Sequence, residues 1–282
     1  MDGVLNVLKP AGMTSFDVIA FLRRVYGQKK IGHGGTLDPL AAGVLPVFLG
    51  RAARLIEYAP IHTKTYEAEF LMGFETDTED VTGKITARGE PLTDIGAWER
   101  AAENFRGSVM QVPSAYSAKQ IGGRRAYDLA REGKEVALPA RPVEISRLCI
   151  RGIDPPYLRL SVTCSSGTYV RALGRDLGRA AGCPLTMSFL LRTEMGPFRI
   201  SEAKTLEEIE AAPEAACGDL RMILSELPQL TLTAEEAAGF LTGKRLRTRA
   251  ADAEEAAVCG PQGFLGIAAV RGGVIHPKKV FS

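Results

Sequence analysis

The sequence predicts an α+β fold in which a mostly antiparallel mixed sheet is followed by a small β-rich unit. Short apolar or alternating runs, which are typical of strands, recur over the first 200 residues with only a few capped helices between them. Near residue 200 the composition shifts to a Glu- and Ala-rich segment, and short strand-like runs resume after about residue 227.

The composition is that of a globular protein without membrane or metal signatures. The chain has 282 residues, 45% of them hydrophobic, which is ample for a buried core. No apolar run approaches the ~20 residues of a membrane span and no signal peptide is evident, so we expect a cytoplasmic protein that binds no membrane. The five cysteines form no CxxC pair and the three histidines are far apart, so we expect neither metal nor cofactor.

The net charge of +2 hides an asymmetry along the chain. Residues 1–200 carry 26 basic against 21 acidic side chains, whereas residues 201–258 carry 6 against 12. A basic body is compatible with a polyanion-binding surface, although such an excess also occurs in proteins that bind no nucleic acid.

A strand over residues 5–8 and a helix from Thr14 to Tyr26 open the chain. Thr14 and Asp17 resemble a capping box, and Gly27 suits the C′ position that ends a helix.

A glycine-dense segment, Gly32 to Pro39, carries a single carboxylate at Asp38. Glycines allow positive φ angles and close backbone approach, and Pro39 disfavours helical geometry at Asp38. A carboxylate on such a restricted loop can act as a nucleophile, a general base or a metal ligand. The segment is equally compatible with an ordinary turn that contains a capping Asp.

Four further elements are predicted before residue 112, namely strands over 44–49 and 66–72, an acidic turn over 76–83, and a helix over 98–105 opened by Thr93 or Asp94. The segment 112–142 is rich in Pro, Gly, Arg and Lys. We interpret it as a long functional excursion, with a possible helix over 125–131.

A strand over 158–164 and a helix over 168–181 are predicted next. Arg171, Arg175 and Arg179 recur every four residues and therefore lie along one side of this helix. The stripe fits either a solvated charged face or a phosphate-facing surface.

Helical segments and short strands make up the remainder of the chain. Residues 203–216 are helical in character, with a Thr205–Glu208 capping box, and a second capped helix spans 234–241. Strands are predicted around Leu246 and over 256–258, 264–270 and 274–276.

Motifs spread over nearly the whole chain form one pattern. They are Lys9-Pro10 with Gly12 to Ser15; Gly32-His33 with Gly35 to Pro39; Lys64-Thr65-Tyr66; Gly73 with Thr76, Thr78, Asp80 and Gly83; Gln111 to Pro113, Tyr116 to Ala118 and Arg125 to Tyr127; Cys164-Ser165 with Gly167 to Arg171; and Leu190 to Thr193 with Gly196. In order and spacing they resemble the tRNA pseudouridine-55 synthase family of the TruB type. Lys119 lies one place earlier than in the family pattern, and Leu191 stands where an Arg is usual, so no role is transferred to Lys119.

The resemblance implies a pseudouridine synthase catalytic domain over 1–218, with an RNA-gripping insertion at about 113–142, and a PUA-like RNA-binding domain over 227–282. It implies a tRNA pseudouridine(55) synthase, an isomerase that flips uridine 55 out of the T-loop and needs no cofactor.

The resemblance also implies roles for individual residues. Asp38 is expected to be the nucleophile, attacking either ribose C1′ or base C6, while Tyr169 moves the released proton and Arg171 pairs with Asp38 and orients it. Tyr66 is expected to stack on the flipped base. Leu190 would wall the pocket and His33 would fill the space left by the base, with Gly32 and Lys64 as further substrate-binding residues. Core packing also fits Tyr66 and Leu190.

Two other functions are compatible with the same motifs. One is a tRNA-folding chaperone or RNA-binding protein, and the other is a guide-dependent synthase that modifies ribosomal RNA. The guide-dependent relatives usually carry terminal extensions, and this chain ends at Ser282 directly after the accessory domain. We therefore expect a stand-alone monomer that binds the T-stem-loop of tRNA without an obligatory protein partner.

Overall fold

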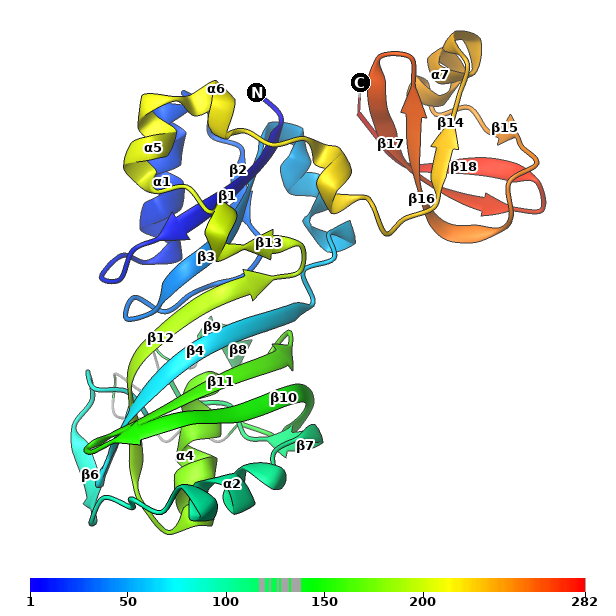
Figure 1. Ribbon diagram of the computed structural model, residues 1–282. Coiled ribbons are helices and arrows are strands. Elements are labelled where there is room, and N and C mark those ends of the chain that lie inside the picture. Colours follow the sequence, from blue (N-terminus) through cyan, green and yellow to red (C-terminus); the bar gives the residue numbers. More distant parts are fainter. Residues whose placement is uncertain (117–119, 122, 126, 128–131, 133–137, 282) are drawn as a thin grey trace.

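The computed structural model describes residues 1–116, 120, 121, 123–125, 127, 132 and 138–281. Within this part of the chain, one large sheet has the strand order β1-β3-β12-β4-β11-β10-β7, with β2 paired to β3 and β13 to β12 (Figure 1). Its strands are β1 (Gly3–Lys9), β2 (Ile31–His33), β3 (Ala42–Leu49), β4 (Thr63–Met72), β7 (Gly107–Gln111), β10 (Arg141–Asp154), β11 (Tyr157–Ser165), β12 (Leu185–Met195) and β13 (Phe198–Arg199).

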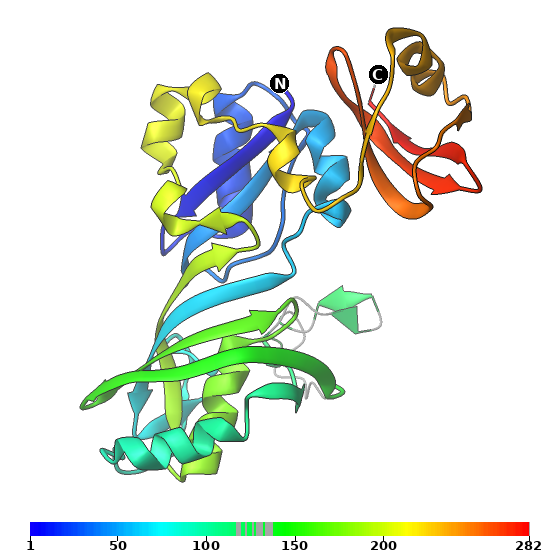
Figure 2. The same ribbon diagram turned by 45° about the vertical axis from the view of Figure 1, so that its right-hand side comes forward.

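The pairing in this sheet is mixed but mostly antiparallel. Among the described strands, β3 and β12 run parallel, and every other neighbouring pair of the sheet is antiparallel. The predicted fold class is therefore confirmed. The β3–β12 contact joins the N-terminal strands to the central ones, and it places the loop before β3 beside the middle of the sheet (Figures 1 and 2).

Helices pack on both parts of the sheet. They are α1 (Ser15–Val25), η1 (Gly50–Tyr58), α2 (Ile95–Glu103), α4 (Val170–Ala181), η2 (Ile200–Glu202), α5 (Leu206–Ala211), α6 (Pro213–Ala216) and η3 (Leu220–Ile223). Apolar residues of α1 and α5 share a core with β1 and β3. Apolar residues of α2 and α4 share a second core with β4, β10, β11 and β12 (Figure 2).

Helix ends follow the local signals in the sequence. Thr14 caps α1 in a capping box with Asp17, and Gly27 adopts a φ of +60° just beyond the helix, as predicted. Asp94 caps α2. The predicted helix over 168–181 begins two residues later, at Val170, because Tyr169 is still in an extended conformation.

Two of the longest strands, β10 and β12, were not predicted from the sequence. The register of β10 against β11 shifts between Ile145 and Arg147 and again between Ile150 and Gly152, and β12 shifts against β4 between Met187 and Phe189. A bulge moves side chains to the other face of the sheet, so the alternation that marks a strand is interrupted.

A small sheet forms the C-terminal unit, with the order β14-β16-β17-β18-β15 and one helix beside it. Its elements are β14 (Gln229–Thr231), α7 (Ala234–Leu241), β15 (Leu246–Arg247), β16 (Ala253–Gly260), β17 (Gly263–Arg271) and β18 (Val274–Val280). The unit lies against η1, where Arg54 stands 5.5 Å from the ring centroid of Phe281 and Lys279 donates to the Arg54 carbonyl (Figure 1).

Two hairpins complete the described structure. β5 (Phe74–Thr76) pairs with β6 (Ile85–Arg88) around the predicted acidic turn, and β8 (Gln120–Ile121) pairs with β9 (Arg124–Arg125) in the segment 112–142. Most of the predicted helix over 125–131 lies outside the described residues. No described helix is long and apolar enough to cross a membrane.

Candidate active site

A pocket of about 230 Å³ lies where the loop before β3 meets β4, β12 and the N-terminus of α4. It is lined by six residues that the sequence singled out, namely Asp38, Lys64, Tyr66, Tyr169, Arg171 and Leu190. Its volume is below the roughly 300–1,000 Å³ of pockets that enclose drug-sized ligands, so it suits a small planar group.

The loop that carries Asp38 is held by hydrogen bonds to the start of α1. The Ser15 hydroxyl accepts from the Leu37 amide at 2.9 Å and donates to the Leu37 carbonyl at 3.2 Å. The Gly12 amide donates to the Pro39 carbonyl at 2.8 Å. Residues on both sides of Asp38 are therefore fixed before any ligand binds.

Two fully buried cations, Arg192 and Lys9, donate hydrogen bonds to main-chain carbonyls of the same loop. Arg192 donates from Nε to the Val44 carbonyl at 2.7 Å and from Nη2 to the Gly35 carbonyl at 3.0 Å. Lys9 donates from Nζ to the Ala41 carbonyl at 2.7 Å, and burial lowers its pKa to about 8. Both residues belong to matched motifs, but no local sequence pattern indicates that their charges are buried against the loop.

Asp38 forms an ion pair with Arg171. Arg171 Nη2 lies 2.8 Å from Asp38 Oδ2, and the arginine side chain is only 6% exposed whereas that of Asp38 is 40% exposed. Arg171 also donates to the carbonyl oxygens of Thr78, at 3.0 Å, and Tyr116, at 3.1 Å. These contacts fix the guanidinium group of Arg171, while the half-exposed Asp38 lines the pocket.

A second carboxylate, Asp80, also pairs with Arg171 and is not among the residues that line the pocket. Asp80 Oδ2 lies 3.5 Å from Arg171 Nη1, and Asp80 is nearly buried. Its Oδ1 accepts from the Thr78 hydroxyl at 2.8 Å and from the Thr82 amide at 3.0 Å. Asp80 was recognised only as part of a motif, because nothing in the sequence connects the turn at 76–83 to α4.

The arginine stripe of α4 fits neither interpretation drawn from the sequence. Arg175 pairs with Glu79, and Arg179 pairs with Glu75. Together with the Arg171–Asp80 pair, these contacts attach one side of α4 to residues 75–80. The stripe is therefore a row of ion pairs inside the protein for Arg171 and Arg175, and it becomes solvent-exposed only at Arg179.

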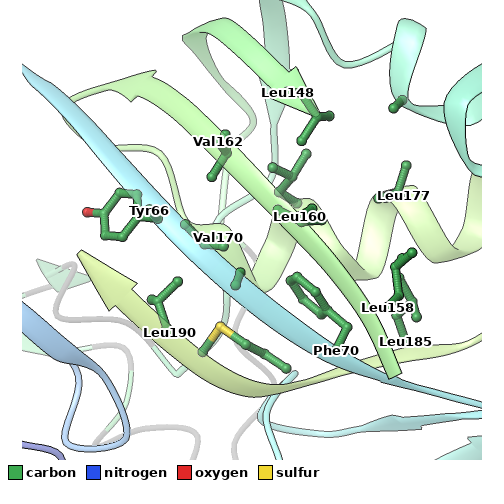
Figure 3. Packing of buried hydrophobic residues seen from close by; sticks show 14 of the residues in the cluster. Tyr66, Phe70, Leu148, Leu158, Leu160, Val162, Val170, Leu177, Leu185 and Leu190 are labelled. Carbon is green, nitrogen blue, oxygen red and sulfur yellow. The ribbon is translucent and has the colours of Figure 1, made fainter. Parts of the chain in front are cut away.

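Tyr66 and Leu190 belong to both the pocket and the core. Each is 6% exposed, and each packs in the cluster that includes Phe70 and Val162. Figure 3 shows Tyr66 at the edge of this cluster, with its hydroxyl directed away from the packed aliphatic side chains. Burial raises the pKa of Tyr66, so its hydroxyl is neutral at pH 7.

Tyr169 is held through its main chain by Gln111, a buried residue of β7. The Tyr169 amide donates to Gln111 Oε1 at 2.8 Å, and Gln111 Nε2 donates back to the Tyr169 carbonyl at 3.1 Å. Arg141, at the start of β10, lies over the Tyr169 ring with its Cζ 4.9 Å from the centroid, and it donates to the Gly167 carbonyl. These contacts fix Tyr169 on the wall of the pocket.

Gly32 and His33 are not among the residues that line the pocket. Both lie in β2, where the position of a Cβ atom at Gly32 would be 3.1 Å from Ile56 Cδ1. Burial lowers the pKa of His33, and its Nδ1 atom is buried without a hydrogen-bond partner in the described structure. The roles expected for these two residues stay predictions.

No group of three or more His, Cys, Asp or Glu side chains is arranged to hold a metal ion within the described residues. The side chains that line the pocket are one carboxylate, six other polar or charged groups and three apolar groups. This set can position a flat polar molecule, attack it with an oxygen nucleophile and exchange a proton with it.

Family models and curated proteins match this chain along its length. A model for the TruB family pseudouridylate synthase N-terminal domain matches residues 23–170, and a model for the pseudouridine synthase II TruB C-terminal region matches residues 228–281. A protein of Caldanaerobacter subterraneus named tRNA pseudouridine synthase B is 42% identical, over all of this chain and 99% of its own. A protein of the same name from Gloeobacter violaceus is 43% identical over 99% of both chains.

Solved structures show the same fold at low identity. A chain from a structure described as an H/ACA RNP bound to a substrate RNA containing 2′-deoxyuridine matches with a TM-score of 0.74 and 21% identity, over 99% of this chain and 85% of its own. A chain from a Cbf5-Nop10-Gar1 complex also matches with a TM-score of 0.74, at 22% identity.

Proposed function

This chain belongs to the TruB family of pseudouridylate synthases, and from this membership we propose that it converts uridine 55 in the T-loop of tRNA to pseudouridine. The observation that carries the proposal is the Asp38–Arg171 ion pair at the wall of a base-sized pocket that also contains Tyr66. A carboxylate oriented by a buried arginine, next to an aromatic ring, is what an attack on a flipped nucleotide requires.

Uridine 55 must leave its stack to reach Asp38. Flipping costs a few kcal/mol, and stacking on an aromatic ring is worth about 1–3 kcal/mol per base. Tyr66 is the proposed stacking surface and Leu190 the opposite apolar wall, and both are already packed in place in the free protein. His33 is proposed to fill the space that the flipped base leaves in the RNA, and Gly32 is proposed as a further substrate-binding residue. Both lie on β2, outside the residues that line the pocket.

Asp38 is proposed as the nucleophile that holds the nucleotide while the base turns. Its carboxylate attacks either ribose C1′ or base C6, the glycosidic bond to N1 breaks, and a new bond forms between C1′ and C5. The proton on C5 must then be removed and one must be added at N1. Tyr169 is the proposed proton carrier, since it lines the same pocket and is fixed by Gln111.

The remaining surfaces are proposed to bind the rest of the tRNA. We assign the chemistry to residues 1–218, RNA gripping to the insertion at about 113–142, and an accessory RNA contact to the C-terminal unit over 227–282. A stand-alone cytoplasmic monomer is favoured over a guide-dependent enzyme. The relatives named tRNA pseudouridine synthase B match both chains almost end to end, whereas the H/ACA likeness is only 21% identical and extends to the fold alone.

Pseudouridine mapping of unmodified total tRNA incubated with the purified protein tests this function. The proposal predicts new pseudouridine at position 55 of most elongator tRNAs without any added guide RNA. If the protein binds tRNA but forms no pseudouridine, it is an RNA-binding protein or folding chaperone. If modification requires a guide RNA, the stand-alone assignment is wrong.

A further inference from the structure

Lys64 places an ammonium group in the pocket without a partner. It lies two residues before Tyr66 on β4, so the two side chains leave the same face of the strand. Its Nζ atom is 3.5 Å from where a Cβ atom at Gly35 would stand, directly beside the loop that carries Asp38. Among the described residues, no hydrogen-bond acceptor or carboxylate is paired with it.

Three other cations around the pocket have ion-pair or hydrogen-bond partners among the described residues. Arg171 has two carboxylates and two carbonyls, while Arg192 and Lys9 each hold carbonyl oxygens of the Asp38 loop. A charged group withdrawn from water without hydrogen bonds is costly. The N–H donors of the Lys64 ammonium group are therefore available to a group that enters the pocket.

We propose that Lys64 is a catalytic residue whose ammonium group stabilises the negative charge that develops on the uracil ring during the isomerisation. This proposal rests on the function proposed above. Preorganised donors that face a developing anion in a pocket partly closed to water are among the largest contributions to catalysis.

Both routes, attack at C1′ and addition at C6, place a negative charge on the uracil ring. If Asp38 attacks C1′, an O–C1′ bond forms, the C1′–N1 bond breaks, and its electron pair remains on the uracil. If Asp38 adds to C6, the C5–C6 electron pair moves into the ring and onto O4. In the first route C5 then bonds to C1′ while the O–C1′ bond to Asp38 breaks. In the second route C5 bonds to C1′ while the C1′–N1 bond breaks, and the O–C6 bond to Asp38 breaks as C5 loses its proton. In both routes C5 loses a proton and N1 gains one, which leaves neutral pseudouridine and a free Asp38 carboxylate.

The position of Lys64 favours the base over a phosphate as its partner. Its ammonium group shares a strand face with the Tyr66 ring, inside a pocket of about 230 Å³, whereas the backbone of the RNA remains outside when one base is flipped. A phosphate contact would contribute mainly to affinity and to its salt dependence. The two partners therefore predict different measurements.

Single-turnover pseudouridine formation on a T-stem-loop RNA separates these partners. We expect Lys64→Met to lower the rate 10²–10³-fold while the Kd for the RNA changes less than threefold, and Lys64→Arg to retain part of the rate. Lys204→Met is the matched control, since Lys204 is exposed and is not among the residues that line the pocket. A Lys64→Met rate within threefold of wild type, or a tenfold weaker Kd at an unchanged rate, overturns the proposal.

The pH profile of kcat/KM gives a second readout that a structural role would not produce. Burial, with a further contribution from Arg192, lowers the pKa of Lys64 to about 8. The titratable and charged groups around it are Asp38, Tyr66, Tyr169 and Arg171 in the pocket, with Arg192 and the Cys164 thiol nearby, and burial raises the pKa of that thiol. Wild-type kcat/KM should fall above about pH 8, whereas Lys64→Arg should extend the plateau. An identical fall in both proteins contradicts the proposal, since the fall would then belong to another group such as Lys9.

A failure of this inference is distinguishable from a failure of the proposed function. Wild-type protein that forms no pseudouridine contradicts the function itself. Active wild-type protein with a fully active Lys64→Met variant contradicts only the role of Lys64.

Discussion

Arg171 and Lys64 line the same pocket but are embedded in opposite ways. Arg171 is buried between Asp38, Asp80 and two main-chain carbonyls, so each side of its guanidinium has a partner. Lys64 is partly withdrawn from water and has no partner in the described part of the chain. Arg171 therefore stabilises the folded structure of the site, whereas the ammonium group of Lys64 is available to bind a ligand.

Because of this difference, we expect substitutions of the two residues to affect activity and stability differently. Removing a satisfied buried cation leaves its carboxylates unpaired, which destabilises the fold. Removing an unsatisfied one relieves a desolvation cost, so the fold gains stability while the function is lost.

Arg171→Met should have the largest effect, because it leaves nearly buried Asp80 without a cation and Asp38 without orientation. We expect at least a 10³-fold loss of single-turnover rate and a decrease of about 3–5 kcal/mol in the free energy of unfolding, measured by urea titration. Arg179→Met is the matched control at the exposed end of the same stripe, where the side chain is 62% exposed. Its effect should stay below about 1 kcal/mol, and equal effects of the two variants would refute the assigned contrast.

Lys64→Met should change stability in the opposite direction. Its folded pKa of about 8 lies below the usual 10.5, so the unfolded chain binds the proton more tightly and the charge opposes folding below about pH 8. The penalty fades as the pH rises towards 10.5, where both states lose the proton. We expect up to about 3 kcal/mol of added stability at pH 7 and a smaller gain at pH 9.5. A destabilised variant at pH 7 would mean that Lys64 has a structural partner.

Gln111→Met should show a smaller effect on rate. It removes both hydrogen bonds to the Tyr169 main chain and so loosens Tyr169 without touching the pocket. We expect a roughly 10–100-fold lower rate, consistent with about 1–3 kcal/mol for unsatisfied buried groups, and an unchanged Kd for the RNA. Gln111→Glu keeps the acceptor and loses the donor, so its rate should be intermediate. If Gln111→Met weakened RNA binding without lowering the rate, Gln111 would not be a residue that positions Tyr169.

Local signals in the sequence predicted much of the fold. The capping boxes at Thr14, Thr205 and Thr233 each start a helix where expected. These signals work because a cap depends on residues three positions apart. Strands β10 and β12 were missed because bulges interrupt their alternation, and the predicted helical segment over 203–216 is divided at Pro213.

Most of the candidate site residues that line the pocket could be named from the sequence, but the contacts between them could not, and Gly32 and His33 lie outside the pocket. Asp38, Tyr66, Tyr169 and Leu190 were named from motifs, and all of them line one pocket. The supporting residues Asp80, Gln111 and Arg192 act across large sequence separations, from a hairpin turn, a short strand and a central strand. No local pattern indicates that Arg192 is buried or that Asp80 contacts α4, since those facts arise only when the sheet assembles.

Site-resolved pseudouridine formation at position 55 of an unmodified tRNA transcript, by wild-type protein and by Asp38→Asn, tests whether Asp38 is the nucleophile. The substitution keeps the size of the side chain but removes the nucleophilic carboxylate. The role proposed for Asp38 predicts complete conversion by the wild type, and no detectable product from a folded Asp38→Asn variant that binds the transcript. Product formation by Asp38→Asn at a near wild-type rate would contradict it.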